Sequence, residues 1–198
     1  MTYSDFTLSL AISKFGLTLD MDTDLFSTVP PLPPGELLQQ TLQYNAPLAI
    51  AISTEKARSE LLIAPVLMEL RRQRGGKVNL FSGNLFSVDI SVGLSGFCDF
   101  LLTHSPYQSE IQAPVVAIVE AKKEDVTNGY GQCVATMVAA QQFNSREHEP
   151  IEIIYGVVTT GDIWKFLSLK GTDVKVDRDT YYLDRIERIL GVLWHVTE

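Results

Sequence analysis

The stretch from Pro114 to Glu124, PVVAIVEAKKE, ends an apolar run with a carboxylate and an ammonium group two positions apart. Alternate residues of a β-strand share one face, so Glu120 and Lys122 point to the same side as Val116 and Ile118. An acid on such a face is costly, because a buried carboxylate needs a cation or hydrogen bonds to replace its water. The pattern therefore singles out Glu120 and Lys122 as candidate functional residues.

Two further acids interrupt apolar patterns. Asp99 lies within the apolar stretch GFCDFLLT, and Glu60 lies in line with the apolar residues of a helix that begins TEKARSELL. Hard cations such as Mg²⁺ and Mn²⁺ prefer carboxylate oxygens, so one bound divalent metal would satisfy these acids and Glu120 together. Lys122 would then neutralise an anion or orient an attacking water beside the metal. The chemistry that these residues predict is metal-assisted hydrolysis of a phosphodiester.

A structural interpretation of the same residues stays open. An acid-x-basic triplet has little weight alone, since roughly two are expected by chance in a chain of this composition. Asp99, Glu120 and Lys122 also fit a buried ion-pair network, which perturbs pKa values as an active site does. Glu60 also fits an ion pair with a basic neighbour such as Lys56.

The elements that must position these residues follow from the periodicity of the sequence. A helix capped by Ser53 or Thr54 should run to about Arg74, with a bend near Pro65, which has no N–H to donate to the Leu61 carbonyl. The further elements expected are strands over 86–92, 96–103 and 114–122, a helix over 129–143, strands over 151–160 and 163–169, and a helix over 180–198. The strand over 114–122 should be central. This order predicts an α/β fold with a mixed sheet.

The N-terminal quarter of the chain has a different pattern. Residues 6–12 alternate apolar and polar, which predicts a half-buried strand, and residues 15–19 would return as its hairpin partner. The proline-rich segment 29–35 should be a rigid connector, followed by a short helix over 36–44. We therefore expect a single domain over 1–198, with an N-terminal β-hairpin and helix extension over 1–50, a core over 54–169 and a closing helix.

The residue types and their order resemble the PD-(D/E)XK superfamily, the restriction-endonuclease-like nucleases. The matching residues are Glu60 in ARSELL, Asp99 in GFCDF, Glu120 and Lys122 in IVEAKK, and Gln132 in GYGQC. The resemblance covers about residues 54–169 and implies an αβββαβ core with a mixed central sheet. One departure is Cys98, which stands where the pattern often has proline. The chain as a whole is also similar to a bacterial family of cyanobacterial type, a resemblance that adds no mechanism.

The superfamily resemblance assigns a role to each matching residue. Asp99 and Glu120, with Glu60 as the acid of the first helix, would hold Mg²⁺ or Mn²⁺. Lys122 would be the catalytic lysine. Gln132 matches a glutamine that lies near the site in RecB-like and type I restriction subunits. A buried glutamine that satisfies backbone groups is the structural alternative for Gln132.

Composition bears on the partner. The formal net charge of −8 argues against a protein that coats nucleic acid, because such affinity comes from neutralising phosphates. An enzyme that meets nucleic acid in one local cleft remains compatible, with DNA expected in preference to RNA. The candidate contacts to nucleic acid are Arg71, Arg72, Arg74, Lys77 and Lys123. The basic clump LRRQRGGK also fits a solvated helix end, where cations complement the helix dipole.

Location and self-association are further expectations. No secretory signal and no apolar run of ~20 residues is visible, and Cys98 and Cys133 are too few for a disulfide framework. A cytoplasmic protein with no membrane partner is therefore expected. A homodimer or higher homo-oligomer is expected because the closing helix presents the apolar run ILGVLW and the N-terminal hairpin has strand edges to cover.

The expected function is that of a divalent-metal-dependent nuclease. The alternative is a catalytically silent nuclease-fold protein that acts as a binding or assembly module, since a fold does not by itself specify an activity. A degenerate module would be expected to have lost one of Asp99, Glu120 and Lys122, and all three are present.

Overall fold

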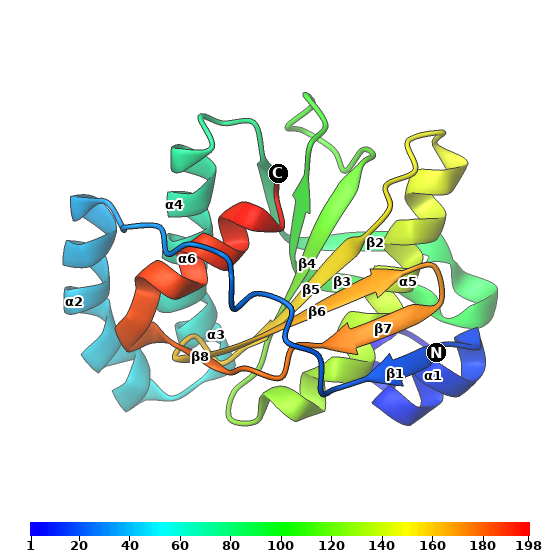
Figure 1. Cartoon of the computed structure of the whole chain (residues 1–198), viewed down its shortest axis with the longest axis horizontal. Helices are drawn as coiled ribbons and strands as arrows, with labels where there is room; N and C mark the ends of the chain where they lie inside the picture. The colour runs from blue at the N-terminus through cyan, green and yellow to red at the C-terminus, as the bar shows by residue number, and fades with distance from the viewer.

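The computed structural model describes the whole chain, Met1 to Glu198, as an α/β protein built on a mixed, open sheet of eight strands (Figure 1). The strands are β1 (Thr18–Asp20), β2 (Asn79–Asp89), β3 (Leu94–Thr103), β4 (Val115–Ala121), β5 (Ile154–Thr159), β6 (Ile163–Lys170), β7 (Asp173–Val176) and β8 (Tyr181–Tyr182). Their order in the sheet is β1-β7-β6-β5-β4-β3-β2, and β8 pairs with β6.

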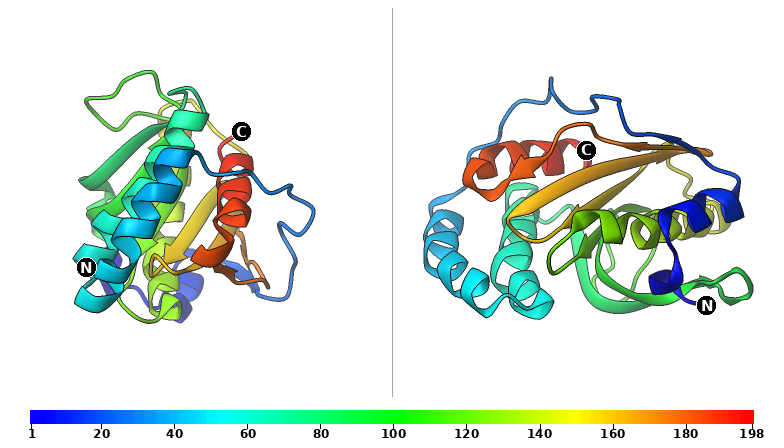
Figure 2. Two further views of the ribbon diagram at one scale, coloured as in Figure 1. Left: turned by 90° about the vertical axis from the view of Figure 1, so that its left-hand side faces the viewer. Right: turned by 90° about the horizontal axis from the view of Figure 1, so that it is seen from below.

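Helices cover both faces of this sheet (Figure 2). They are α1 (Leu8–Phe15), α2 (Glu36–Ile52), α3 (Glu55–Arg58), α4 (Ala64–Gln73), α5 (Tyr130–Arg146) and α6 (Ile186–His195). One buried cluster joins the sheet to α1 and α5, and a second joins it to α4 and α6, with α2 packed outside α3 and α4. None of these helices has the length and apolar content needed to span a bilayer.

β4 is a central strand, as the sequence predicts. It pairs antiparallel with β3 and parallel with β5, and all seven of its residues are buried. The register with β3 places Leu101 opposite Ile118 and Phe100 opposite Val119. The prediction of an α/β fold with a mixed sheet is therefore confirmed. β7 and β8 were not expected, and the strand expected over 15–19 lies at 18–20 as β1.

The helix capped by Thr54 has the expected start and the expected interruption. The Thr54 side chain accepts a hydrogen bond from Ala57 N at 3.1 Å. A π-helical turn over Ser59–Ile63 joins α3 to α4 directly before Pro65. Pro65 cannot donate to the Leu61 carbonyl, and that carbonyl instead accepts from Asn45 Nδ2 of α2 at 2.9 Å.

The expected N-terminal β-hairpin is wrong. Residues 8–15 form α1, because the Thr7 side chain caps the helix by accepting from Leu10 N at 3.2 Å and Gly16 ends it with a φ of 62°. A short alternation of apolar and polar residues is compatible with a strand or with a helix. Here the Thr7 cap at the start and Gly16 at the end favour the helix. Residues 18–20 instead form β1, which pairs parallel with β7 at the edge of the sheet.

Two helices differ from expectation in length or exposure. α2 does not end at residue 44 but continues to Ile52, with the internal Pro47 on its exposed side. The apolar run ILGVLW was expected to be available for association, but α6 packs on the sheet and buries five of its six residues. These are Ile189, Leu190, Gly191, Val192 and Leu193.

Candidate active site

β3 and β4 separate at the end of the sheet where the candidate acids lie. Their pairing extends as far as Phe100 and Val119. Beyond this pair, Asp99 Oδ2 accepts a hydrogen bond from Ala121 N at 2.8 Å, so a carboxylate takes the place of a main-chain acceptor. This bond fixes the Asp99 carboxylate beside Glu120, in agreement with the prediction that the two acids meet.

Glu120 is buried, with only 2% of its surface exposed. Burial and then the charge of Asp99 raise the pKa of Glu120 to about 8, against the opposing effect of Lys122. Lys122 Nζ donates to Glu120 Oε1 at 2.7 Å. The two carboxyl groups are thus close enough to repel, and a cation between them would relieve that repulsion.

Lys122 joins these acids to helix α5. Its Nζ donates to Glu120 and also, at 3.3 Å, to Oε1 of Gln132, which lies in the first turn of α5. Burial acts to lower the pKa of Lys122, but the charge of Glu120 and, to a smaller extent, those of Glu55 and Asp99 outweigh it, so the pKa is raised. Lys122 is therefore a protonated ammonium at neutral pH, and Gln132 lies beside it as the sequence pattern predicts.

Glu60 does not join the cluster. Its carboxylate pairs with Lys56 at 3.0 Å and its side chain is 60% exposed, which matches the structural alternative. The acid that the first helix brings to the site is Glu55, whose charge contributes to the raised pKa of Lys122. The sequence signal for Glu55 was its place directly after the Thr54 cap, at the end of the helix that points to the cluster.

Two polar hollows open beside the cluster. One, of about 160 Å³, is lined by Glu55, Lys56, Ser59, Ser82, Gly83, Asp99 and Ala121. The other, of about 270 Å³, is lined by Glu55, Lys122, Lys123, Glu124, Asp125 and Asn128. Glu55 belongs to both, so the hollows adjoin, and Glu60 lines neither. A polar ligand can therefore approach both Asp99 and Lys122 from solvent.

Most of the predicted nucleic-acid contacts lie elsewhere. Arg72 pairs with the buried Glu69 at 2.6 Å, and Arg74 lies over the Trp194 ring at 4.5 Å. These residues, with Arg71 and Lys77, belong to the carboxyl end of α4 and the turn after it, whereas the cluster meets the start of α3. Roughly 24 Å of helix separates the two ends at about 1.5 Å per residue. Lys123 alone of the predicted contacts lines a hollow of the site.

The donor set fits a hard divalent cation held partly by water. No group of three or more His, Cys, Asp and Glu side chains is arranged as a complete metal site. Asp99 Oδ2 and Glu120 Oε1 accept the hydrogen bonds already described, and a hydrogen bond between the two carboxyl groups helps to raise the pKa of Glu120, so a metal would replace the proton between them. Mg²⁺ keeps several waters and needs only one or two carboxylates plus substrate oxygens.

Comparison of the chain with protein-family models, with curated proteins and with solved structures gave no match. What the site can do must therefore be inferred from its own residues. They provide two adjacent carboxyl groups, one protonated lysine held by a glutamine, and polar access from solvent.

Proposed function

We propose that this protein is a divalent-metal-dependent nuclease of the PD-(D/E)XK type, which hydrolyses phosphodiester bonds in nucleic acid. The observation that carries the proposal is the meeting of Asp99, Glu120, Lys122 and Gln132 from two strands and a helix at one end of the sheet. The order α3–α4, β2, β3, β4, α5 and β5 is consistent with the αβββαβ core of that superfamily.

Each residue has a role in this proposal. Asp99 and Glu120 would hold Mg²⁺ or Mn²⁺, and Glu55, in place of Glu60, would be the third acid, acting through water. A divalent metal held there would supply an acidified water molecule and stabilisation of the charge that develops on the phosphate. Lys122, fixed by Glu120 and Gln132, orients the attacking water and neutralises a phosphate oxygen.

The substrate meets the site through the two hollows. Lys56 and Lys123 line them, with side chains 81% and 54% exposed, and are placed to contact phosphates on either side of Glu55. The cations at the end of α4 are too far away for this role. DNA is the expected substrate in preference to RNA.

Cleavage assays test the proposal. Purified protein is incubated with single-stranded DNA, duplex DNA and RNA, each with Mg²⁺ or Mn²⁺ and with a chelator as control. Cleavage should need the metal, and Lys122→Ala should lower the rate by ~10² or more, as for other lost transition-state groups. The matched control is Lys170→Ala, an exposed lysine that is paired with Glu152 at the opposite end of the sheet from the cluster, which should keep most of the activity.

The same assay distinguishes the two acids of the first helix. Glu55→Gln should slow cleavage, whereas Glu60→Gln, which removes only the exposed pair with Lys56, should leave the rate within about twofold, as for a weak surface ion pair. A chain that binds Mn²⁺ but cleaves none of the three substrates would contradict the nuclease proposal.

One observation favours a second function, a catalytically silent binding or assembly module. Lys122 already neutralises Glu120 directly, and no third acid completes a metal site. In that case the cluster is a structural ion-pair network, and Lys122→Ala would leave Glu120 unpaired at a cost of ~3–5 kcal/mol of stability. For the nuclease, the same variant should keep its fold and most of its metal affinity, because Lys122 is not a ligand.

A further inference from the structure

Helix α2 has an unusual surface for an outer helix. Of its seventeen residues, ELLQQTLQYNAPLAIAI, only the first is charged, in a chain in which 20% of residues are charged. Only Leu38 and Ala49 are buried. Leu37 is 68% exposed, Tyr44 82% and Leu48 49%. Figure 1 shows α2 at the edge of the molecule, with no element beyond it.

Five residues along one side of α2, four of them exposed and Thr41 half-buried, follow a heptad pattern. Leu37, Thr41, Tyr44, Leu48 and Ala51 are spaced by four, three, four and three residues, and none is charged. This is the spacing of a and d positions in a coiled coil, where such residues form the contact between two helices. We call these five residues the α2 seam. Within the chain α2 packs on α3 and α4 through the side that carries Leu38 and Ala49, which lies next to the seam, and Tyr44 and Leu48 of the seam remain exposed.

We propose that the α2 seam binds the α2 seam of a second copy of this chain, with the two helices antiparallel. A two-fold axis between Leu42 and Gln43 sets Leu48 of each copy opposite Leu37 of the other. The same axis sets Tyr44 opposite Thr41, so that the largest seam residue meets a small one. An antiparallel pair also brings the positive end of each helix dipole to the negative end of the other.

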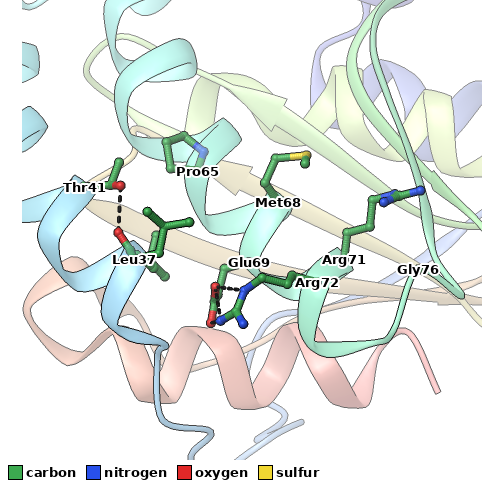
Figure 3. A pocket seen from close by; sticks show the side chains of 9 residues that line it. Leu37, Thr41, Pro65, Met68, Glu69, Arg71, Arg72 and Gly76 are labelled. Carbon is green, nitrogen blue, oxygen red and sulfur yellow. Dashed lines mark hydrogen bonds and ion pairs between the residues drawn. The ribbon is translucent and has the colours of Figure 1, made fainter.

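A pocket beside Thr41 can receive the opposing Tyr44 (Figure 3). It has a volume of about 340 Å³ and lies between α2 and α4, where Leu37, Thr41, Pro65 and Met68 form an apolar part of its lining. The other lining residues are Leu38, Arg71, Gly76 and the ion pair of Glu69 and Arg72. Thr41 Oγ1 donates to Leu37 O at 2.7 Å, so its methyl group is free to pack. A tyrosine ring would insert as a knob between side chains of two helices, which is how coiled coils pack.

Charge favours a second copy over other occupants. α2 has no Lys, Arg or His, whereas helices that lie on anionic membranes or nucleic acid carry basic residues. Two copies of a chain with net charge −8 repel, and the repulsion is least where the meeting surfaces are uncharged. The run ILGVLW of α6, which the sequence suggested for association, is buried. The α2 seam is therefore the surface that suits a homodimer.

Sedimentation of the full chain tests the proposal. The wild type should show a concentration-dependent monomer–dimer equilibrium. Tyr44→Glu and Leu48→Glu should each weaken the dimer at least about tenfold, because each buries a charge at the seam. Gln43→Glu is the matched control, since it adds the same charge to an exposed position on another side of α2 and should change the equilibrium little. Melting curves of all three variants check that they fold.

Two outcomes would overturn the proposal. One is a wild type that sediments as a monomer at concentrations up to about 0.5 mM, because the dissociation constant of the dimer would then be too high for a specific association. The other is dissociation by Gln43→Glu as complete as by Tyr44→Glu, which would indicate a general effect of charge and no specific seam.

Disulfide cross-linking tests the direction of the helices. In the antiparallel pair, a mixture of Leu37→Cys and Leu48→Cys chains should form a disulfide between the two variants. Neither variant should cross-link to itself, because identical positions lie about 16 Å apart along the axis. The native Cys98 and Cys133 are buried and should not interfere. Self-cross-linking of either variant would show a parallel pair and refute the antiparallel one.

Discussion

Glu120 is the residue on which the chemistry of the site depends. It is buried, it lies against the Asp99 carboxylate, and it is paired with Lys122 on its other side. Burial and the neighbouring acid favour a proton on Glu120, and Lys122 or a metal favours the carboxylate. Proton, lysine and metal therefore compete for one group, and the competition can be measured.

The competition predicts how stability changes with pH. The pKa of Glu120 is about 8 in the folded chain, above its ordinary value of 4.5. Between these values the folded state binds more protons than the unfolded state, so the free energy of unfolding falls as pH rises from about 4.5 to about 8. Lys122 adds nothing to this window, because its raised pKa lies above 10.5. Glu120→Gln should remove the dependence.

A bound metal should oppose this loss of stability at higher pH, because it binds the deprotonated carboxylates. Mn²⁺ should raise the melting temperature of the wild type more at pH 8 than at pH 6, and should not raise that of Glu120→Gln at either pH. Melting curves of both proteins at the two pH values, with and without Mn²⁺, measure these effects. Equal Mn²⁺ shifts in both proteins would place the metal elsewhere.

The error at Glu60 has a physical cause. Its predicted position assumed a regular helix, in which Glu60 is in line with Ala57, Ile63, Ala64 and Leu67. Ala57, Ile63 and Leu67 are buried and Ala64 is half-buried, but Glu60 is exposed. It lies within the π-helical turn, where the backbone does not keep the period of 3.6 residues. By contrast, Asp99, Glu120 and Lys122 lie on or directly after strands, whose period of two could be followed from the sequence.

Among the elements, the joint between α2 and the α3–α4 helix shows the same limit of prediction. The loss of a donor to the Leu61 carbonyl could be foreseen, because proline has no N–H. The donor that replaces it could not, because the expected helix ended at residue 44, one position before Asn45. Whether a helix continues past such a point depends on tertiary packing, and α2 continues because it packs against α3 and α4.

This joint predicts a local cost in stability. Asn45→Ala leaves the partly buried Leu61 carbonyl without its donor, and should lower the free energy of unfolding by about 1 kcal/mol or more. Gln43→Ala, two positions earlier and exposed on the same helix, should change it by less than ~0.5 kcal/mol. Urea denaturation of both variants measures the difference. Equal stability of the two would mean that water replaces the Asn45 amide at no cost.

For the whole molecule, charge sets how it can meet nucleic acid. The net charge is −8, and Arg72 and Arg74 at the end of α4 are engaged within the protein. Few cations are left beside the site, chiefly Lys56, Lys122 and Lys123. A polyanion would therefore be repelled by most of the surface, and a divalent metal at Asp99 and Glu120 would supply much of the attraction.

Binding of DNA should therefore depend on metal more than on salt. Without divalent ions the chain should bind DNA weakly. Ca²⁺ has the same charge as Mg²⁺ and also prefers oxygen ligands, so it should raise the affinity for DNA. The logarithm of affinity should fall with that of salt concentration with a slope of only about −1 to −3, since few phosphates are neutralised. Fluorescence anisotropy with a labelled oligonucleotide measures both quantities.

Lys123→Ala should weaken binding and Arg71→Ala should not, because of these two residues only Lys123 lines the site. Tight binding in a chelator with a steep salt dependence, lost in Arg71→Ala, would instead assign recognition of nucleic acid to the end of α4.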